Sequence, residues 1–374
     1  MPSHLTEPAR PKMDTGPARN NSYGVGDMVD FDSLEINVFS AAEPSRDLDE
    51  VRVLLAACDL DLEGDIRWFA AARGDHGLAG CAGLAGNTIK CVAVAAQYRG
   101  GNLSARLLEE AENLALRQGH AHLFLYTRPV NIPLFRKCGF YPLAQWDTVA
   151  ALMENTPVGI SHYCQNLARH YRPGERIGAV VMNANPFTLG HAYLAERAAA
   201  ASDWLHIFVV REDASLFPYA ERLEMVQRGV AHLDNVTVHP GSEYLISRAT
   251  FPHYFLRDSH LVGQTHSAID LLIFRNYLAP ALGITQRFVG TEPYCPVTGQ
   301  YNRDMRIWLE QPSRSPSPPI RVVEIPRKCQ ASGWAISASR VRALLKEGRL
   351  SSVGEIVPPS TLEFLTAFQR PECA

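Results

Sequence analysis

Apolar and polar positions in the first half of the chain predict a strand, a helix and a second strand in succession. Ile89–Val94 is an apolar run of strand length, and His122–Thr127 is another. Gly119 stands where the intervening helix should end, because glycine adopts the left-handed conformation that closes many helices. The apolar residues of that helix recur every three or four positions and predict one buried face: Leu103, Leu107, Leu108, Ala111, Leu114 and Ala115.

A second alternation of strands and helices begins after residue 175. Strands that alternate with helices pair in parallel and bury both faces of their sheet. The pattern therefore predicts an α/β protein whose C-terminal part is built on a parallel sheet. Five short apolar runs, with helical patterns between most of them, predict its strands: Ile177–Met182, Leu205–Val210, Val236–Val238, Arg287–Val289 and Val322–Ile325.

The chain divides into domains between these two alternating regions. The intervening stretch is polar and ends at Pro173 and Gly174, which predicts a connector, although 161–171 could be helical. A chain of 374 residues has the length of two or three domains. The first residues contain several prolines and few apolar side chains, which predicts a flexible leader. We expect a leader at 1–32, an N-terminal domain at 33–155, a connector at 156–175 and a C-terminal domain at 176–374.

Composition narrows the class of protein. Hydrophobic residues make up 46% and charged residues 20% of the chain, a balance that supports folded cores and excludes a largely disordered chain. The 36 Lys and Arg nearly balance the 39 Asp and Glu, so the whole chain has no electrostatic preference for nucleic acid or an anionic membrane. No apolar run has the length of a membrane span. Any anion site must therefore be local.

The eight cysteines are scattered along the chain. They form no CxxC pair and no cluster with histidine at the spacing of a zinc site, so we assign no metal-ligating residues. Scattered thiols are typical of a reducing compartment, which predicts a cytoplasmic protein.

The first candidate site follows the strand Ile177–Met182. The segment Asn183–His191, NANPFTLGH, leads directly into a helical pattern, so it should join the carboxyl end of a strand to the amino end of a helix. Unpaired N–H groups and the helix dipole favour a phosphate there. Gly190 allows close approach, while Thr188 and His191 supply groups that can bind phosphate oxygens. A turn capped by Thr188, with His191 on the helix surface, explains the same residues equally well.

The second candidate site is ISASRVR, Ile336–Arg342, which leads from a loop into a helix that should end at Gly348. Ser337 is a plausible N-cap residue, but Arg340 stands where a capping box requires Glu or Gln. Two hydroxyls and two guanidiniums at one helix start suit a polyphosphate. A capped surface helix with solvated arginines is the alternative interpretation.

Both helix starts can meet above the carboxyl edge of one parallel sheet, where nucleotides bind in such folds. NPFTLGH resembles the (H/T)xGH motif, and ISASRVR the ISSTxxR motif, of the nucleotidyltransferase superfamily of adenylyl transferases. Thr188 stands where many members have His, and Ala338 where many have Ser. The resemblance implies a Rossmann-like domain with three groups of site residues: Thr188 and His191 at the α-phosphate, Ser337, Ser339 and Arg342 at the β- and γ-phosphates, and Asn185, Pro186 and Phe187 on the adenine and ribose side.

A glycine turn follows the first predicted strand and opens the first predicted helix. Its sequence, QYRGGN, can form a cradle of backbone N–H groups for a pyrophosphate. The turn resembles the (Q/R)xxGx(G/A) acetyl-CoA loop of the GNAT acetyltransferase fold, from which it departs at its last position, and Asn131 and LFRKCGF resemble the end of that fold. An ordinary glycine turn is the alternative. The resemblance implies a GNAT-like α+β domain that binds a CoA moiety through Gln97, Arg99, Gly100, Gly101 and Asn102.

From about residue 35 onward the chain resembles the citrate (pro-3S)-lyase ligase family, the acetate:SH-acyl-carrier ligases. The resemblance implies an enzyme that converts acetate and ATP to acetyl adenylate and pyrophosphate. It then transfers the acetyl group to the thiol of a dephospho-CoA-derived arm on the acyl carrier subunit of citrate lyase, and AMP leaves. Mg²⁺ would be carried mainly by the ATP phosphates. Five stretches carry the resemblance: NANPFTLGHAYL, VVREDASLFPYAERLEMV, VHPGSEYLISRATFP, FVGTEPYCPVTGQYN and AISASRVR.

Two other functions are compatible with these motifs. One is plain adenylyl transfer to a phosphopantetheine or mononucleotide-type acceptor, without acyl transfer. The other is a non-catalytic sensor of nucleotide or CoA, against which the intact Thr188, Gly190, His191 and Arg342 argue.

Several further positions are candidates on weaker grounds. Gly290 and Thr291 end a strand at the same sheet edge and could meet the nucleotide. Glu292 or Asp213 could help to hold Mg²⁺, and the sequence does not choose between them. Arg222 could reach a phosphate, but an exposed helical arginine is the stronger expectation.

Overall fold

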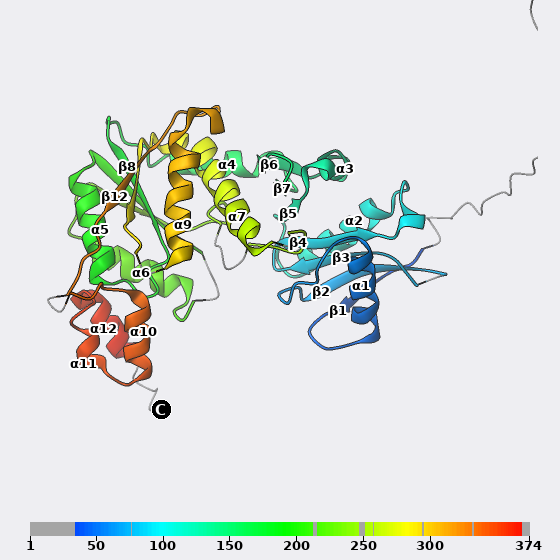
Figure 1. The fold of residues 1–374 in the computed structure, drawn as a ribbon, viewed down its shortest axis with the longest axis horizontal. Helices are drawn as coiled ribbons and strands as arrows, with labels where there is room; N and C mark the ends of the chain where they lie inside the picture. Colours follow the sequence, from blue (N-terminus) through cyan, green and yellow to red (C-terminus); the bar gives the residue numbers. More distant parts are fainter. Residues whose placement is uncertain are drawn as a thin grey trace, which may run out of the picture.

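The computed structural model describes residues 34–75, 77–211, 215–246, 251–256, 258–293, 295–330 and 333–368. Its strands form two sheets, one in each half of the chain, which lie side by side in Figure 1. The leader predicted for 1–32 lies outside the described residues.

The N-terminal sheet has seven strands in the order β1-β2-β3-β4-β5-β7-β6. Neighbouring strands are antiparallel except β4 and β5, which are parallel and are joined by the crossover helix α2, Leu103–Arg117. The predicted succession of strand, helix and strand is therefore confirmed. The strand bounds are β1 Ile36–Ser40, β2 Trp68–Gly74, β3 Gly77–Ala85, β4 Thr88–Val94, β5 Phe124–Thr127, β6 Tyr141–Trp146 and β7 Ala150–Glu154.

Helices cover both faces of this sheet. All six apolar residues predicted for one face of α2 are buried, and they pack on β2, β3 and β4. Gly119 has a φ of +87° just beyond the helix, as its predicted role in ending the helix requires. The helix α1, Arg46–Ala57, packs on β3 and β4 from the other side, and α3, Ile132–Lys137, follows β5 (Figure 1).

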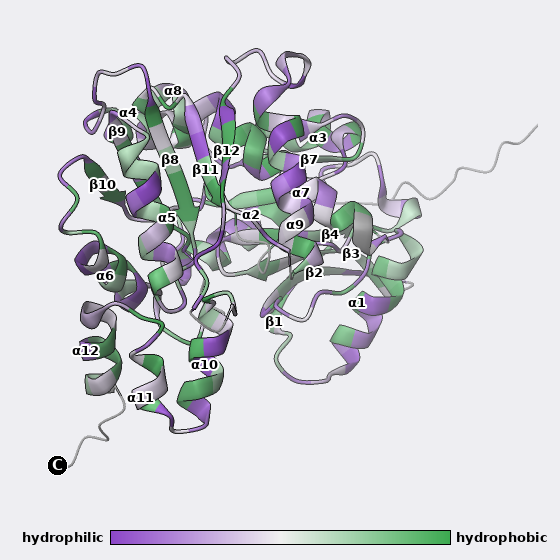
Figure 2. Ribbon diagram, turned by 60° about the vertical axis from the view of Figure 1, so that its left-hand side comes forward, coloured by the Kyte–Doolittle hydropathy of each residue, from purple (hydrophilic) through white to green (hydrophobic). Residues whose placement is uncertain are grey.

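The C-terminal sheet has five strands in the order β10-β9-β8-β11-β12, and every pair is parallel. The predicted parallel α/β domain is therefore confirmed, and Figure 2 shows hydrophobic residues along its central strand β8. The chain runs outward from β8 in one direction to β10 and then in the other to β12, so the strand order reverses beside β8. The strand bounds are β8 Ile177–Met182, β9 Trp204–Val209, β10 Val236–His239, β11 Gln286–Gly290 and β12 Arg321–Ile325.

The remaining helices cover the C-terminal sheet or join it to the N-terminal one. The stretch expected to be a connector contains α4, which packs on α8 and on the π-helical turn Phe274–Leu278. A second π-helical turn, Arg306–Glu310, follows α9. The helix bounds are α4 Gly159–Ala168, α5 Leu189–Ala200, α6 Tyr219–Gly229, α7 Ser259–Ile273, α8 Ala279–Leu282, α9 Pro296–Met305, α10 Ala338–Lys346, α11 Leu350–Val353 and α12 Pro359–Phe368.

One hydrophobic cluster spans both sheets. The cluster that contains the buried face of α1 continues through α7 to the C-terminal strands. A buried polar contact crosses the same boundary, because the hydroxyl of Tyr244 donates to Glu154 of β7 at 2.7 Å. The two halves are therefore packed against each other along the length of α7.

Two further features concern the thiols and the helices. The seven cysteines within the described residues are all free. Across the same parts of the chain, no helix is both long enough and apolar enough to cross a bilayer.

Two buried histidines should make the stability of the C-terminal sheet depend on pH. His206 of β9 and His239 of β10 are in contact at 2.8 Å between Nδ1 and Nε2, and both are almost completely buried. Burial lowers the pKa of His206 to about 4 and that of His239 to about 3, from an ordinary value of 6.5. The neutral rings therefore stabilise the fold above pH 6.5, and this contribution is lost as the pH falls toward 4.

We expect the midpoint of thermal unfolding to fall as the pH is lowered from 7 to 4.5, and to fall less steeply in His206→Asn. His232, an exposed histidine near Glu196, provides the matched control, because His232→Asn should keep the original slope. Equal slopes for all three proteins would contradict the assignment.

Candidate functional site

The first predicted motif forms the loop between β8 and α5, at the reversal of strand order. Thr188 is the N-cap residue of α5, and its side chain and backbone both contact His191. The N–H of Thr188 donates to Nδ1 of His191 at 3.1 Å, so the proton of a neutral imidazole is on Nε2. His191 therefore has its Nε2–H available as a hydrogen-bond donor.

The surroundings of His191 keep it neutral. Burial, and second the positive charge of Arg327, lower its pKa to about 4. The ring stacks on Phe187 with centroids 5.7 Å apart. Phe187 is itself completely buried, so it can shape the site only through residues that pack on it, such as His191. It also packs tightly beneath Gly229, where an added Cβ would lie 2.2 Å from its ring.

The second predicted motif forms the start of α10. The side chain of Ser337 caps the helix by accepting from the N–H of Arg340 at 3.2 Å. The prediction of Ser337 as the N-cap residue is therefore confirmed. Ser339 accepts from Nη2 of Arg342 at 3.1 Å. The hydroxyl of Ser339 thus holds the guanidinium that the motif contributes.

The structure brings these two helix starts into contact. Nη1 of Arg342 donates to the backbone oxygen of Asn185 at 2.6 Å, across a sequence separation of 157 residues. A Cβ added to Gly190 would lie 3.3 Å from the backbone oxygen of Ile336, so glycine allows the two segments to approach closely. His191 and Arg342 therefore belong to one local site at the carboxyl edge of the sheet. Asn185 and Pro186, joined by a cis peptide bond, lie in the same loop.

The ends of β11 and β12 complete this edge. The N–H of Thr291 donates to the backbone oxygen of Ile325 at 2.9 Å, directly after Gly290. Arg327 donates to the backbone oxygen of Thr291 at 2.9 Å and forms an ion pair with Glu292. The sequence analysis did not identify Arg327, although a charged residue shortly after a strand at this edge of the sheet can indicate a site residue.

Glu292 is already engaged. Besides its ion pair, it accepts from the N–H of Cys295 at 3.0 Å, and its side chain is 5% exposed. Asp213, the other candidate for Mg²⁺, lies outside the described residues. Among the residues that are described, no three His, Cys, Asp or Glu side chains are grouped so that they could hold a metal ion.

The expectation of an exposed Arg222 is wrong. Its side chain is completely buried beneath the first loop, where it donates to the backbone oxygens of Asn183, Val210 and Phe217 at 2.7, 2.9 and 3.2 Å. Arg222 therefore ties together the loops that follow β8 and β9. Burial of a guanidinium is favourable here because backbone oxygens accept its N–H groups.

The glycine turn of the N-terminal half lies at the carboxyl end of β4. Gly100 has a φ of +91°, a conformation that favours glycine, and Asn102 is the N-cap residue of α2. Arg99 folds back onto the strand, donating to the backbone oxygen of Val94 at 3.0 Å. Gln97 and Gly101 are exposed beside it. The turn is therefore exposed to solvent at the amino end of α2.

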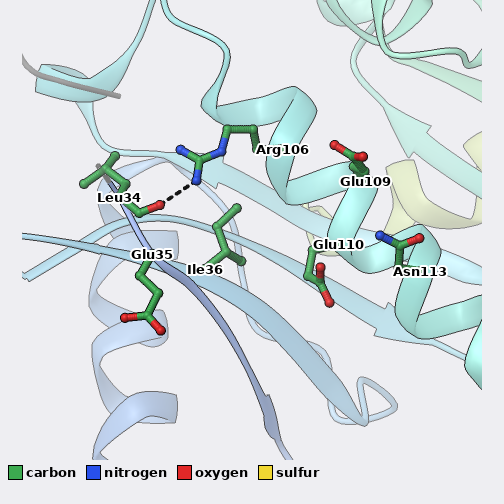
Figure 3. Close-up of a pocket in the computed structure, with 7 residues that line it drawn as sticks. All are labelled: Leu34, Glu35, Ile36, Arg106, Glu109, Glu110 and Asn113. Carbon is green, nitrogen blue, oxygen red and sulfur yellow. Dashed lines mark hydrogen bonds between the residues drawn. The ribbon is translucent and has the colours of Figure 1, made fainter. Parts of the chain in front are cut away.

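A separate groove of about 550 Å³ lies between the start of β1 and α2 (Figure 3). Arg106 donates across it to the backbone oxygen of Leu34 at 2.6 Å. Three carboxylates line it, Glu35, Glu109 and Glu110, which makes it a poor site for phosphate. We therefore place the candidate site at the sheet edge and not in this groove.

Fold and site together define the class of protein. A nucleotidyltransferase-like parallel-sheet domain follows a GNAT domain in a single chain. The N-terminal half matches the family model described as Acetyltransferase (GNAT) family over residues 30–140. The model described as Citrate lyase ligase C-terminal domain matches residues 177–365.

Relatives extend this match over most of the chain. Citrate (pro-3S)-lyase ligase of Klebsiella pneumoniae is 49% identical over 84% of this chain and 91% of its own length. The protein of the same name from Escherichia coli K12 is 48% identical over 86% of this chain and 91% of its own length. The chain belongs to the citrate lyase ligase family, and it is an enzyme of the ligase class. Phosphopantetheine adenylyltransferase of Corynebacterium glutamicum is 27% identical over 31% of this chain and 69% of its own length.

Replacement of the buried arginine should destabilise the site loops. In Arg222→Met the three backbone oxygens lose their charged donor, which should lower the free energy of unfolding by about 3 kcal/mol. Arg228→Met on the same helix is the matched control, because that arginine is exposed and pairs with Glu224 at the helix surface. The control should change the free energy by less than about 1 kcal/mol. Chemical denaturation measures both, and equal small losses would contradict the structural role of Arg222.

Proposed function

We propose that the chain activates acetate with ATP and transfers the acetyl group to the thiol arm of the acyl carrier subunit of citrate lyase. The observation that carries this proposal is the contact between the two helix starts, Arg342 on Asn185 and Gly190 on Ile336. Two amino ends of helices, with a guanidinium between them, suit a triphosphate. Family membership supports the ligase chemistry, since the relatives bear the name citrate (pro-3S)-lyase ligase.

The first step is attack by an acetate oxygen on the α-phosphorus of ATP. The bond to the bridging oxygen breaks, and pyrophosphate leaves with the electron pair. In this proposal, Nε2–H of His191 and the hydroxyl of Thr188 donate to the α-phosphate, while Ser337, Ser339 and Arg342 hold the β- and γ-phosphates. The hydrogen bonds from these donors strengthen as negative charge develops on the phosphate oxygens, and this stabilises the transition state electrostatically.

The neighbouring residues have supporting roles in this proposal. Asn185, Pro186 and Phe187 shape the adenine and ribose side, and Gly290 and Thr291 border it. Mg²⁺ arrives on the ATP phosphates, consistent with a hard cation that prefers oxygen ligands and keeps several waters. Glu292, which is paired with Arg327, is left out of this role.

The second step uses the thiol of the carrier arm. The thiolate attacks the acetyl carbonyl of acetyl adenylate, the bond to the phosphate oxygen breaks, and AMP leaves. We propose that the N-terminal domain binds the CoA-like part of this arm through Gln97, Arg99, Gly100, Gly101 and Asn102. The open turn at the amino end of α2 supports this role, because its backbone N–H groups can hold a pyrophosphate.

Loss of the imidazole should slow the first step. We expect acetate-dependent exchange of radiolabelled pyrophosphate into ATP to fall about 100-fold in His191→Ala, the cost of removing one such donor. The exposed His232 provides the control, and His232→Ala should retain the original rate. Exchange that proceeds equally well without acetate would instead indicate adenylyl transfer to another acceptor. Full ATP turnover by His191→Ala would rule out the catalytic assignment.

Obstruction of the glycine turn should affect only the second step. In Gly100→Trp, acetyl transfer to the holo-carrier should fall at least about tenfold relative to pyrophosphate exchange in the same preparation, because the bulky side chain occupies the cradle. Gly119→Trp is the matched control at the other end of α2, since Gly119 also has a positive φ and open space around its Cα. Equal transfer by both variants would show that the turn does not bind the arm.

A further inference from the structure

The segment that follows β5 carries an exposed apolar stripe. A 3₁₀ turn, Pro129–Asn131, continues directly into α3, Ile132–Lys137. Helical residues three or four positions apart lie on one face, so Val130, Leu134 and Lys137 share a face. Val130 is 80% exposed, more than any other large apolar side chain within the described residues, and Leu134 is 43% exposed. This face of the segment is therefore turned to solvent.

The opposite face of α3 is packed into the domain, which holds the stripe on the outside of the molecule (Figure 1). Phe135 of α3 is buried in the same hydrophobic cluster as the buried face of α2. α3 also packs on β6, where Tyr141 adds a third exposed apolar side chain. Exposed apolar side chains that gather in one place mark binding surfaces, whereas single ones are ordinary. We define the α3 surface by six exposed residues: Arg128, Val130, Leu134, Arg136, Lys137 and Tyr141.

The α3 surface is locally basic. Three of its six residues are cations, and the chain contains no Asp or Glu from residue 121 to residue 146. The glycine turn and its flanks, 91–108, contain none either, and Arg99 adds another exposed cation there. The whole chain has a net charge of −3, so this positive charge is a local feature. Cations at the end of α3 also favour its helix dipole, but the dipole does not explain the apolar stripe beside them.

The α3 surface and the glycine turn lie at one edge and on one face of the N-terminal sheet. β4 leads into the turn and β5 leads into α3, and the two strands are parallel neighbours, so their carboxyl ends point to the same edge. α2, which follows the turn, shares its hydrophobic cluster with Phe135 of α3. Cys138, directly after α3, lies near Glu112 of α2. A molecule held at the turn therefore has the α3 surface as a neighbour.

We propose that the α3 surface docks the protein body of the acyl carrier subunit, which contacts it through an acidic and partly apolar face. This inference rests on the proposed function, in which the glycine turn binds the arm of the same carrier. The arm tethers the carrier body close to the turn, where the α3 surface offers both cations and apolar side chains. Opposite charges steer the encounter, while the apolar stripe forms the centre of the contact, as in other interfaces with an apolar core and a polar rim.

Val130 and Val53 form a matched pair that tests the apolar stripe. Val53 is 72% exposed, but it lies on α1, which packs on the other side of the sheet. We expect Val130→Asp to weaken the binding of apo-carrier, which lacks the arm, at least about tenfold, because a central apolar contact is replaced by a repelling charge. Val53→Asp should keep the original Kd. Isothermal titration calorimetry measures both values. Equal affinities of the two variants, or failure of apo-carrier to bind the unaltered protein, would overturn the proposal.

A double charge reversal tests the basic rim. Arg136→Glu combined with Lys137→Glu should raise the KM for holo-carrier in acetyl transfer at least about fivefold at low salt, because the steering charge is inverted. Arg46→Glu combined with Arg52→Glu on α1 makes the same change in net charge, and it should keep the original KM because the ion pairs that it breaks are at the surface. Equal increases in KM would show that the net charge acts and that the α3 surface does not.

Two further measurements separate docking of the carrier from other results. Acetate-dependent pyrophosphate exchange should be unchanged in all four variants, since the α3 surface lies outside the adenylating site. Absence of this exchange in the unaltered protein would refute the proposed function, whereas the binding of apo-carrier tests the α3 surface independently of it. Sedimentation velocity addresses a second copy of this chain as the occupant. A dimer of the unaltered protein that only Val130→Asp dissociates would refute docking of the carrier at this surface.

Discussion

The close contact between the start of α5 and the segment that enters α10 holds the candidate site together. Gly190 permits this contact because any side chain there would press on the backbone oxygen of Ile336. Arg342 then reaches the backbone oxygen of Asn185. Beneath the same loop, Arg222 holds three backbone oxygens that follow β8 and β9 or precede α6. The edge of the sheet is thus fixed by charged hydrogen bonds to the backbone, which are stronger than neutral ones.

The electrostatics of this edge suit an anion although the chain as a whole is slightly acidic. Arg342 and Arg327 supply the positive charge, while His191 remains a neutral donor. A positive His191 would add repulsion near Arg327 before a ligand arrives.

The two halves of the chain also depend on each other for packing. Their shared hydrophobic cluster runs from α1 to the C-terminal strands, and buried acids anchor the boundary at two places. Glu154 accepts from Tyr244, and Glu63 accepts from the backbone of Tyr254. Each of these carboxylates would be costly to bury alone, so the polar contacts favour one arrangement of the halves.

Local patterns in the chain predicted the elements and most of the motif positions. Strand and helix periodicity is local, so the five parallel strands, the buried face of α2 and the caps at Thr188 and Ser337 could all be predicted. Burial is set by residues far away in the chain, and for that reason Arg222 was expected to be exposed although it is fully buried.

Folding of the whole chain brings particular elements together. It placed Arg342 on the loop of Asn185, brought Arg327 near enough to lower the pKa of His191, and brought the hydroxyl of Tyr254 onto β5 of the other half. Such contacts join positions far apart along the chain, and no local pattern of apolar and polar residues encodes them. Pairing between distant segments depends on the order of strands in the sheet, which emerges only when the whole chain has folded.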